Sequence, residues 1–263
     1  MNLGTEIKLM TEHLAEDEQS ELMVCPKCSG GASEEKSFTA RKTASGVAFI
    51  CYRASCGFKG LVKAKGSGLL RYKEPKPKEP KPFTGDRSPL PDYAKSFLAS
   101  KFPMGIDFFL ERGVKYSHFK NRVLYPINNF RGERYGWVAR WYPFVNTTTS
   151  AKSILYRDTD DVLHFATRPA ERMVIVEDWV SAERVGEVVP CVAVLGADLS
   201  AQSVELLKSL GVKELTLCLD PDAIAKAVEI KDRLCLEFTI TVLPVKTDPK
   251  DMTPEEFKLF EEI

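Results

Sequence analysis

From residue 172 onward the chain alternates short apolar segments with helix-like segments, and this alternation limits the possible folds more than any other feature. The apolar segments expected to be strands are 172–177, 191–195, 214–219 and 239–243. The segments expected to be helices are 179–188, 200–210 and 223–237. Strands that are almost continuously apolar and alternate with helices are typical of a mainly parallel sheet covered on both faces. The sequence therefore predicts an α/β fold here.

Carboxylates stand where two of these strands end. Glu177 ends the first strand, and Asp220 and Asp222 follow the third, while a later loop carries Asp248 and Asp251. In open parallel sheets, ligands bind beyond the carboxyl ends of the strands, and carboxylate oxygens suit Mg²⁺ or Mn²⁺. Asp220 and Asp222 are also typical caps of a following helix. Because Glu177 joins them at one sheet edge, we interpret the three as a divalent-cation site for nucleotide chemistry.

Four of the seven cysteines form two closely spaced pairs. Cys25 and Cys28 are followed, after 22 residues, by Cys51 and Cys56. Such spacings suit four thiolates on one tetrahedral zinc ion, and in an intracellular chain they favour metal over disulfides. A region of about 40 residues has too little core to fold unaided, so we expect zinc to stabilise an antiparallel zinc ribbon. The remaining cysteines are expected to pack in the α/β core: Cys191, Cys218 and Cys235.

A tract rich in proline, lysine and glutamate, around residues 72–82, interrupts the chain. Proline excludes helix and central strand, so we expect an extended, charged spacer. The predicted parts are a zinc-ribbon domain with an N-terminal extension at 1–65, a linker at 66–90 and a larger domain at 91–263. Within the larger domain we expect a basic subdomain at 91–165 and the α/β subdomain at 166–263.

The larger domain is strongly polarised in charge. Residues 112–157 carry 9 basic side chains against 1 acidic, whereas residues 158–263 carry 11 basic against 22 acidic. This suits a protein that holds phosphates in one place and cations in another. Residues 121–157 read as a β meander. Because no apolar run approaches the roughly 20 residues of a membrane span and the N-terminus is unlike a signal peptide, we expect a cytoplasmic protein without membrane contact.

The motifs, taken in order, resemble a known family. The runs Val176–Ala182, Leu195–Ala197 and Leu219–Ala223 look like a TOPRIM domain. With a zinc ribbon in front, the chain resembles bacteriophage primases and bacterial-type replicative primases over about residues 21–255. The resemblance implies an α/β TOPRIM core, preceded by a small mixed α+β basic subdomain and the ribbon. It also implies synthesis of short RNA primers on single-stranded DNA from ribonucleoside triphosphates, with structural Zn²⁺ and catalytic Mg²⁺ or Mn²⁺.

The resemblance also implies roles for particular residues. Glu177 matches the catalytic glutamate of the family, and Asp220 and Asp222 match its metal-binding pair. Asp251 best matches a later acidic metal ligand, with Asp248 as the alternative. The basic segment resembles the part of the family that binds template and nucleotide phosphates, which implies this role for Arg122, Arg140 and Lys152.

Two positions depart from the family pattern. The family usually has glycine after the glutamate and an acidic residue four positions beyond it, whereas this chain has Asp178 and Ser181. We expect Asp178 not to replace the missing ligand, because adjacent residues tend to point in different directions. Metal binding is therefore expected to be weaker or to use fewer ligands. The helicase half of many phage primases has no counterpart in this sequence, so a helicase is expected on another chain or not at all.

Three hypotheses follow. The first is a DNA primase, a DNA-directed RNA polymerase and nucleotidyltransferase. Its partners would be single-stranded DNA, nucleoside triphosphates, a separate helicase and a DNA polymerase, in the host cytoplasm if the chain is phage-encoded. The second is a non-catalytic protein that binds single-stranded DNA or mediates recombination on the same scaffold, which the departure at Ser181 favours. The third is a TOPRIM nuclease, which would need neither the ribbon nor the basic segment.

Overall fold

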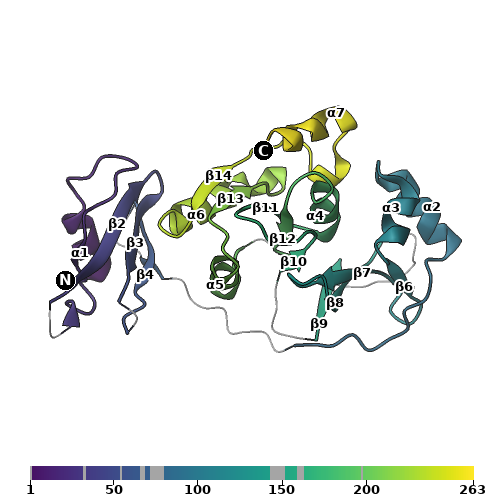
Figure 1. Cartoon of the computed structure of the whole chain (residues 1–263), viewed down its shortest axis with the longest axis horizontal. Coiled ribbons are helices and arrows are strands. Elements are labelled where there is room, and N and C mark those ends of the chain that lie inside the picture. The colour runs from purple at the N-terminus through teal and green to yellow at the C-terminus, as the bar shows by residue number, and fades with distance from the viewer. Residues whose placement is uncertain are drawn as a thin grey trace.

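In the residues that it describes, the computed structural model contains three β-sheets arranged along an elongated molecule (Figure 1). It describes residues 2–31, 34–53, 55–65, 69–71, 80–142, 152–158, 163–196 and 198–263. The cysteine-bearing sheet lies at one end, the sheet β10–β14 in the middle, and the sheet β6–β9 with helices α2 and α3 at the other end. Within the described parts of the chain, no helix has both the length and the apolar character needed to cross a membrane.

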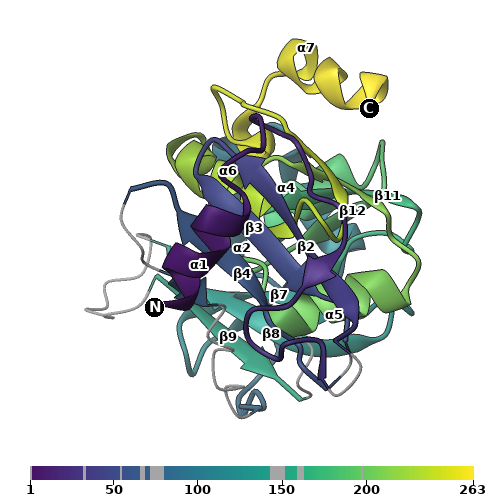
Figure 2. The ribbon, with the colours of Figure 1, turned by 90° about the vertical axis from the view of Figure 1, so that its left-hand side faces the viewer.

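The first sheet is antiparallel and holds a small aromatic core. Its elements are α1 (Leu3–Met10), β1 (Met23–Val24), β2 (Lys36–Thr43), β3 (Gly46–Cys51), β4 (Lys59–Lys63) and β5 (Leu69–Arg71). Phe38, Phe49 and Phe58 lie with ring centroids 4.7 to 6.5 Å apart, and Ile7 of α1 joins the same cluster. Figure 2 looks onto this end of the molecule and shows α1 lying over the sheet. The sheet has the antiparallel form expected of the cysteine-bearing region.

The second sheet, β6-β7-β8-β9, is an antiparallel meander packed against two helices. Its elements are α2 (Asp92–Lys101), α3 (Gly105–Glu111), β6 (Lys115–Ser117), β7 (Arg122–Asn128), β8 (Arg134–Arg140) and β9 (Ser153–Arg157). Because side chains alternate between the faces of a strand, Tyr125 packs with α2 and α3, whereas Leu124 lies on the opposite face with Trp137 and Tyr156. The two faces therefore have separate surroundings.

The third sheet carries the candidate site. Its elements are β10 (His164–Phe165), β11 (Arg172–Val176), α4 (Trp179–Val185), β12 (Cys191–Ala193), α5 (Ala201–Ser209), β13 (Glu214–Leu217), α6 (Ile224–Leu234) and β14 (Thr239–Val242). In the order β10-β12-β11-β13-β14 only β10 is antiparallel. Ile175 packs toward α5 and α6, while Val174 and Val176 pack toward α4. Burial on both faces explains the continuous apolar run Met173–Val176 of β11.

The regular elements of this sheet are shorter than their apolar runs. Strand β13 ends at Leu217, although Cys218 and Leu219 are buried beyond it. The helix expected from residue 223 begins with a 3-10 turn, η2 (Pro221–Ala223), before α6. The C-terminal part folds as η3 (Pro249–Asp251), α7 (Pro254–Phe257) and η4 (Lys258–Glu262). Apolar runs therefore mark burial, which extends further than strand pairing.

The predicted linker is only partly described. Residues 66–68 and 72–79 lie outside the described parts of the chain. Residues 80–90 pack onto the second sheet, because Phe83 and Leu90 are buried and Ser88 forms a β-bridge with Tyr116. At the other end of the basic subdomain, β10 pairs with β12 and so belongs to the third sheet. The domain boundaries themselves stay a prediction.

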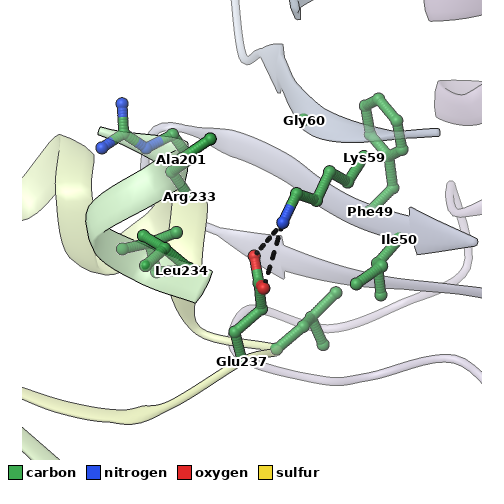
Figure 3. A pocket seen from close by; sticks show the side chains of 10 residues that line it. Phe49, Ile50, Lys59, Gly60, Ala201, Arg233, Leu234 and Glu237 are labelled. Carbon is green, nitrogen blue, oxygen red and sulfur yellow. Dashed lines mark hydrogen bonds and ion pairs between the residues drawn. The ribbon is translucent and has the colours of Figure 1, made fainter. Parts of the chain in front are cut away.

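The first sheet docks on helices α5 and α6 of the third-sheet layer (Figure 3). Lys59 Nζ on β4 lies 3.1 Å from both carboxylate oxygens of Glu237 and 3.3 Å from Glu205. Ser45 also hydrogen-bonds Asp232. Beside the ion pair is a pocket of about 20 Å³, room for about one water molecule. The ribbon is thus held against its own chain.

Candidate active site

The carboxyl ends of the neighbouring parallel strands β11 and β13 bring acidic residues together. The strands pair in register from Arg172 with Glu214 to Ile175 with Leu217, so both strands end at the same edge of the sheet. Glu177 directly follows β11, and Asp220 follows β13 after two buried residues. This is the edge at which the sequence predicts a cation site.

Three aspartates form the tightest acidic group in the described residues. Carboxylate oxygens of Asp178, Asp220 and Asp248 all lie within 4.8 Å of one another. Asp178 is therefore part of the cluster, contrary to the expectation that it points elsewhere. It begins α4 as the N-cap, and its Oδ1 accepts hydrogen bonds from the backbone N–H groups of Val180 and Ser181. Capping turns its second oxygen, Oδ2, toward the cluster, where Lys250 contacts it.

A lysine already occupies part of this acidic group. Lys250 Nζ lies 2.6 Å from Asp178 Oδ2 and also contacts Asp248 Oδ2. The side chains of all three residues are at most 20% exposed. Ser181 Oγ donates a 2.8 Å hydrogen bond to Asp248 Oδ1. Ser181 therefore positions the carboxylate of Asp248, from a distant segment, within this group.

The site has an excess of negative charge. Burial raises the pKa of Glu177, and the charges of Asp220, Asp178 and Asp222 raise it further, while Lys250 opposes the rise. Burial likewise raises the pKa of Asp220, with Lys250 opposing the effect of the neighbouring carboxylates. A raised pKa means that burial and the neighbouring carboxylates together disfavour the ionised form. These carboxylates are therefore suited to bind an added cation.

The remaining predicted acidic ligands lie at the margin. Asp222 is exposed on η2, close enough for its charge to affect Glu177 and Asp220. Asp251 is exposed on η3 and is not part of the three-aspartate group, which contains Asp248 instead. Of the two later candidates, the geometry favours Asp248.

Of the three predicted basic residues, Arg140 faces the carboxylates. It lines a pocket of about 210 Å³ together with Glu177 and Asp178. Its Nε atom is buried and has no hydrogen-bond partner among the described residues. Arg140 also stands over the Tyr142 ring, 5.8 Å from its centroid. A guanidinium with a spare donor opposite acidic residues is suited to bind a phosphate whose metal ion the carboxylates would hold.

The other two basic candidates have different surroundings. Arg122 is 3% exposed, and its guanidinium donates to the carbonyl oxygens of Ala139 and Lys152. Burial lowers the pKa of Arg122. In this conformation Arg122 holds strand ends together and does not present its charge to a ligand. Lys152 is exposed at the start of β9, so its side chain is accessible.

The four paired cysteines converge as predicted. The sulfur atoms of Cys25, Cys28, Cys51 and Cys56 lie within 4.8 Å of one another, with Cys25 and Cys56 at 3.9 Å and Cys28 and Cys51 at 4.0 Å. Zinc–sulfur bonds of about 2.3 Å in a tetrahedron require sulfur atoms about 3.8 Å apart. The donor set therefore fits a structural zinc ion. Cys191 and Cys218 are buried in the core, as expected, and Cys235 is half-buried.

Lys250 is the residue of the site that sequence reasoning missed. A signal was present, because Lys250 lies two positions after Asp248 with Pro249 between them. This is the spacing that brings Asp220 and Asp222 toward the same edge. A lysine in a loop is usually expected to be a solvated surface charge, so the sequence alone did not indicate that Lys250 belongs to the site.

No known family profile matches this chain, and no curated protein does either. Among solved structures, the RNA polymerase domain of Mycobacterium tuberculosis primase DnaG with double-stranded DNA is 18% identical, with a TM-score of 0.47; the match covers 60% of this chain and 68% of that one. The zinc-binding and RNA polymerase domains of Aquifex aeolicus primase are 21% identical, with a TM-score of 0.43 and coverage of 67% and 48%. The Escherichia coli primase catalytic core is 18% identical, with a TM-score of 0.43 and coverage of 67% and 65%.

The chain thus spans about half to two thirds of the length of these solved structures. They are DnaG-type primase catalytic cores and zinc-binding plus RNA polymerase domains.

Proposed function

We propose that this protein is a DNA primase that makes short RNA primers on a single-stranded DNA template by metal-dependent nucleotidyl transfer. The observation that carries the proposal is the convergence of carboxylates from three segments at one sheet edge, opposite Arg140 across a shared pocket. Phosphoryl transfer depends mainly on positioning and on electrostatic stabilisation. A site with metal-binding carboxylates on one wall and a guanidinium on the other supplies both.

In the proposed reaction, the 3′-hydroxyl oxygen of the growing primer attacks the α-phosphorus of a nucleoside triphosphate, and pyrophosphate leaves. Glu177, Asp220 and Asp222 would hold Mg²⁺ or Mn²⁺, with Asp248 or Asp251 as a further ligand. Such an ion neutralises phosphate charge and activates the attacking hydroxyl. Arg140 would bind the triphosphate from the opposite wall, and Lys152, which is exposed, would contact a phosphate further out.

The proposed domain organisation follows from this function. Residues 1–65 would be the zinc-ribbon domain, 66–90 the linker, and 91–263 the polymerase domain, with a TOPRIM subdomain at 166–263. The template would lie between the basic subdomain and the carboxylate edge. Ribonucleoside triphosphates and single-stranded DNA are the proposed substrates, and a helicase and a DNA polymerase on other chains are the proposed partners. Within the same proposal, the chain acts in the cytoplasm, that of the host if it is phage-encoded.

The experiment is incorporation of labelled nucleoside triphosphates on a single-stranded DNA template with Mg²⁺ or Mn²⁺. Wild-type protein should make short RNA, and Asp220→Asn should lose at least about 100-fold in rate, because one amide cannot replace a metal-binding carboxylate. The control is Glu171→Gln, an exposed acid paired with Lys213 beyond the far end of β11, which should keep full activity. Absence of RNA synthesis by the zinc-loaded wild type would refute the proposal.

A second function would account for Lys250, whose ammonium fills part of the acidic cluster. A built-in cation reduces the need for metal, as in a non-catalytic protein that binds single-stranded DNA or mediates recombination. Such a protein would bind single-stranded DNA tightly and make no RNA. Its Asp220→Asn variant would bind the DNA with the same affinity as wild type. Tight binding without synthesis would therefore establish this alternative.

A further inference from the structure

The face of the second sheet that points away from the carboxylates carries a row of cations over aromatic rings. Side chains alternate along β7, β8 and β9, so Tyr125, Val138 and Leu155 line the candidate active site. Their neighbours in sequence belong to the separate cluster on the opposite face, which contains Phe83, Leu124, Trp137, Ala139 and Tyr156. We call this opposite face, with the side chains that cover it, the back face.

Four cations cover the rings of the back face. Lys81 and Lys120 lie 5.6 and 5.9 Å from the centroid of Tyr156. Arg87 and Arg134 lie 5.9 and 4.8 Å from the centroid of Trp137. Among the described residues, none of these four cations forms an ion pair with a carboxylate. Their charges are therefore available to an anionic partner.

An exposed aromatic ring projects beside these cations. Phe119 is 78% exposed, more than any other large hydrophobic side chain in the described residues. Lys120 Nζ stands 5.2 Å from the Phe119 centroid and also reaches Tyr156, so it joins the ring to the row of cations. Phe119 is not part of the buried cluster of the back face. Shielding that cluster from water therefore does not explain why an exposed ring stands here.

The loop that presents Phe119 is held rigidly. Asp86 accepts hydrogen bonds from the backbone N–H groups of His118 and Phe119, and from the hydroxyl groups of Ser117 and Ser88. Although its burial acts in the opposite direction, these hydrogen bonds hold the pKa of Asp86 well below its usual range. Asp86, next to Arg87 in the sequence, is thus satisfied by neutral donors. A loop whose backbone is ordered before binding loses little conformational entropy when a partner stacks on the side chain that it presents.

We propose that the back face binds a single strand of nucleic acid, with a base stacked on Phe119 and phosphates on Lys81, Arg87, Lys120 and Arg134. Cations interleaved with an exposed ring are the combination by which proteins bind single strands without reading sequence. An acidic protein segment would use the cations but not the ring. This surface goes beyond the proposed catalytic site, because it lies on the other side of the sheet from Arg140.

The test is binding of a labelled oligothymidylate to the full zinc-loaded chain. Fluorescence anisotropy measures the affinity, without nucleotides or added magnesium. Phe119→Ala should weaken binding at least fivefold, since stacking of one base contributes roughly 1–3 kcal/mol. The matched control is Leu110→Ala, which removes another exposed apolar side chain in the same subdomain and should leave the affinity unchanged. Equal affinity of Phe119→Ala and wild type would overturn the proposal.

The cations are tested by the salt dependence of binding. A triple variant, Lys81→Ala with Lys120→Ala and Arg134→Ala, should lower the slope of log K against log salt by about 2, or roughly 0.7 per phosphate contact. The control removes three exposed lysines elsewhere, Lys101, Lys213 and Lys258, and should leave the slope closer to that of wild type. Equal slopes for the two triple variants would overturn the proposal.

A third measurement separates a nucleic-acid strand from an acidic protein segment. In Phe119→Trp, oligothymidylate should quench the added indole fluorescence by stacking, whereas polyglutamate should not. Quenching by polyglutamate alone would assign the surface to an acidic protein and refute the proposal. Because no measurement here depends on RNA synthesis, failure of the proposed catalytic function would leave these outcomes unchanged.

Discussion

The ammonium of Lys250 lies 2.6 Å from the carboxylate of Asp178, within the acidic group formed with Asp220 and Asp248. Lys250 thus supplies a fixed positive charge where a cation-binding cluster would otherwise bind an ion. Burial raises the pKa values of Glu177 and Asp220 beside it, and repulsion from the neighbouring carboxylates raises them further, so the charge of Lys250 does not balance the whole cluster. We infer that the site combines one fixed cation with room for an added divalent ion.

Replacing Lys250 with methionine tests this relationship. Lys250→Met should lower the free energy of unfolding by about 3–5 kcal/mol without magnesium, because breaking a largely buried ion pair leaves charges uncompensated. Magnesium should then stabilise the variant by about 2.7 kcal/mol at 100 times its dissociation constant, and wild type by less. Denaturant unfolding with and without magnesium measures both effects. If magnesium stabilised variant and wild type equally, Lys250 would not occupy a cation position.

The raised pKa values of Glu177 and Asp220 predict how stability depends on pH. A carboxyl group whose pKa rises on folding favours the folded state while it is protonated, and this contribution is lost as the pH rises through the folded pKa. The window therefore begins near the ordinary values of 4.5 for Glu and 3.8 for Asp and extends upward. Without divalent cations, the contribution of these two groups to stability should fall across this window.

Asp220→Asn is the variant for this prediction. It removes one of the two titrating groups and part of the repulsion on Glu177, so the difference in unfolding free energy between variant and wild type should change with pH. The difference should favour the variant more at pH 7 than at pH 4. Added magnesium should reduce the difference by binding the ionised wild-type site. A difference that is independent of pH would contradict the assigned charge repulsion.

The sequence predicted the mixed α/β class and the antiparallel cysteine-bearing sheet because both depend on local signals. Apolar runs mark strands buried on two faces, and Cys25 and Cys28 lie at a spacing set by zinc chemistry. Strand β10 gave no such signal, since His164 and Phe165 pair with β12 over only two residues. The packing of residues 80–90 on the second sheet depends on Phe83 and Leu90. Both residues lie among prolines, so the sequence pattern there predicts an extended linker and not buried side chains.

Within the candidate site, side-chain direction was the part that sequence could not give. Asp178 follows Glu177 directly, and alternation in a strand would point the two apart. The strand ends before them, however, and Asp178 caps α4. Arg122 shows the converse case, because its basic character suggested a phosphate contact, whereas tertiary packing buries its guanidinium against backbone carbonyl groups. Both outcomes depend on contacts between segments distant in sequence.

Removing zinc should unfold the ribbon and leave the third sheet folded. Cys51→Ser breaks the four-thiolate set, and a small domain that depends on metal then lacks the free energy to fold. Hydrogen exchange measured by mass spectrometry should show loss of protection in β2, β3 and β4, and retained protection in β11 and β13. The control is Cys235→Ser, outside the cluster, which should keep the ribbon protected. Full protection of β2–β4 in the metal-free protein would contradict a structural zinc site.

Reversing the charge of Lys59 should release the ribbon from α5 and α6. Lys59→Glu places a carboxylate beside Glu237 and Glu205, and the Glu237 side chain is only 5% exposed, so repulsion replaces an ion pair that solvent screens little. Small-angle X-ray scattering should then show a larger radius of gyration, because the docked ribbon becomes free to move away. The matched control is Lys63→Glu, an exposed residue at the end of the same strand, which should keep the dimensions of wild type. An unchanged radius for Lys59→Glu would mean that the remaining contacts, including Ser45 with Asp232, hold the ribbon without the ion pair.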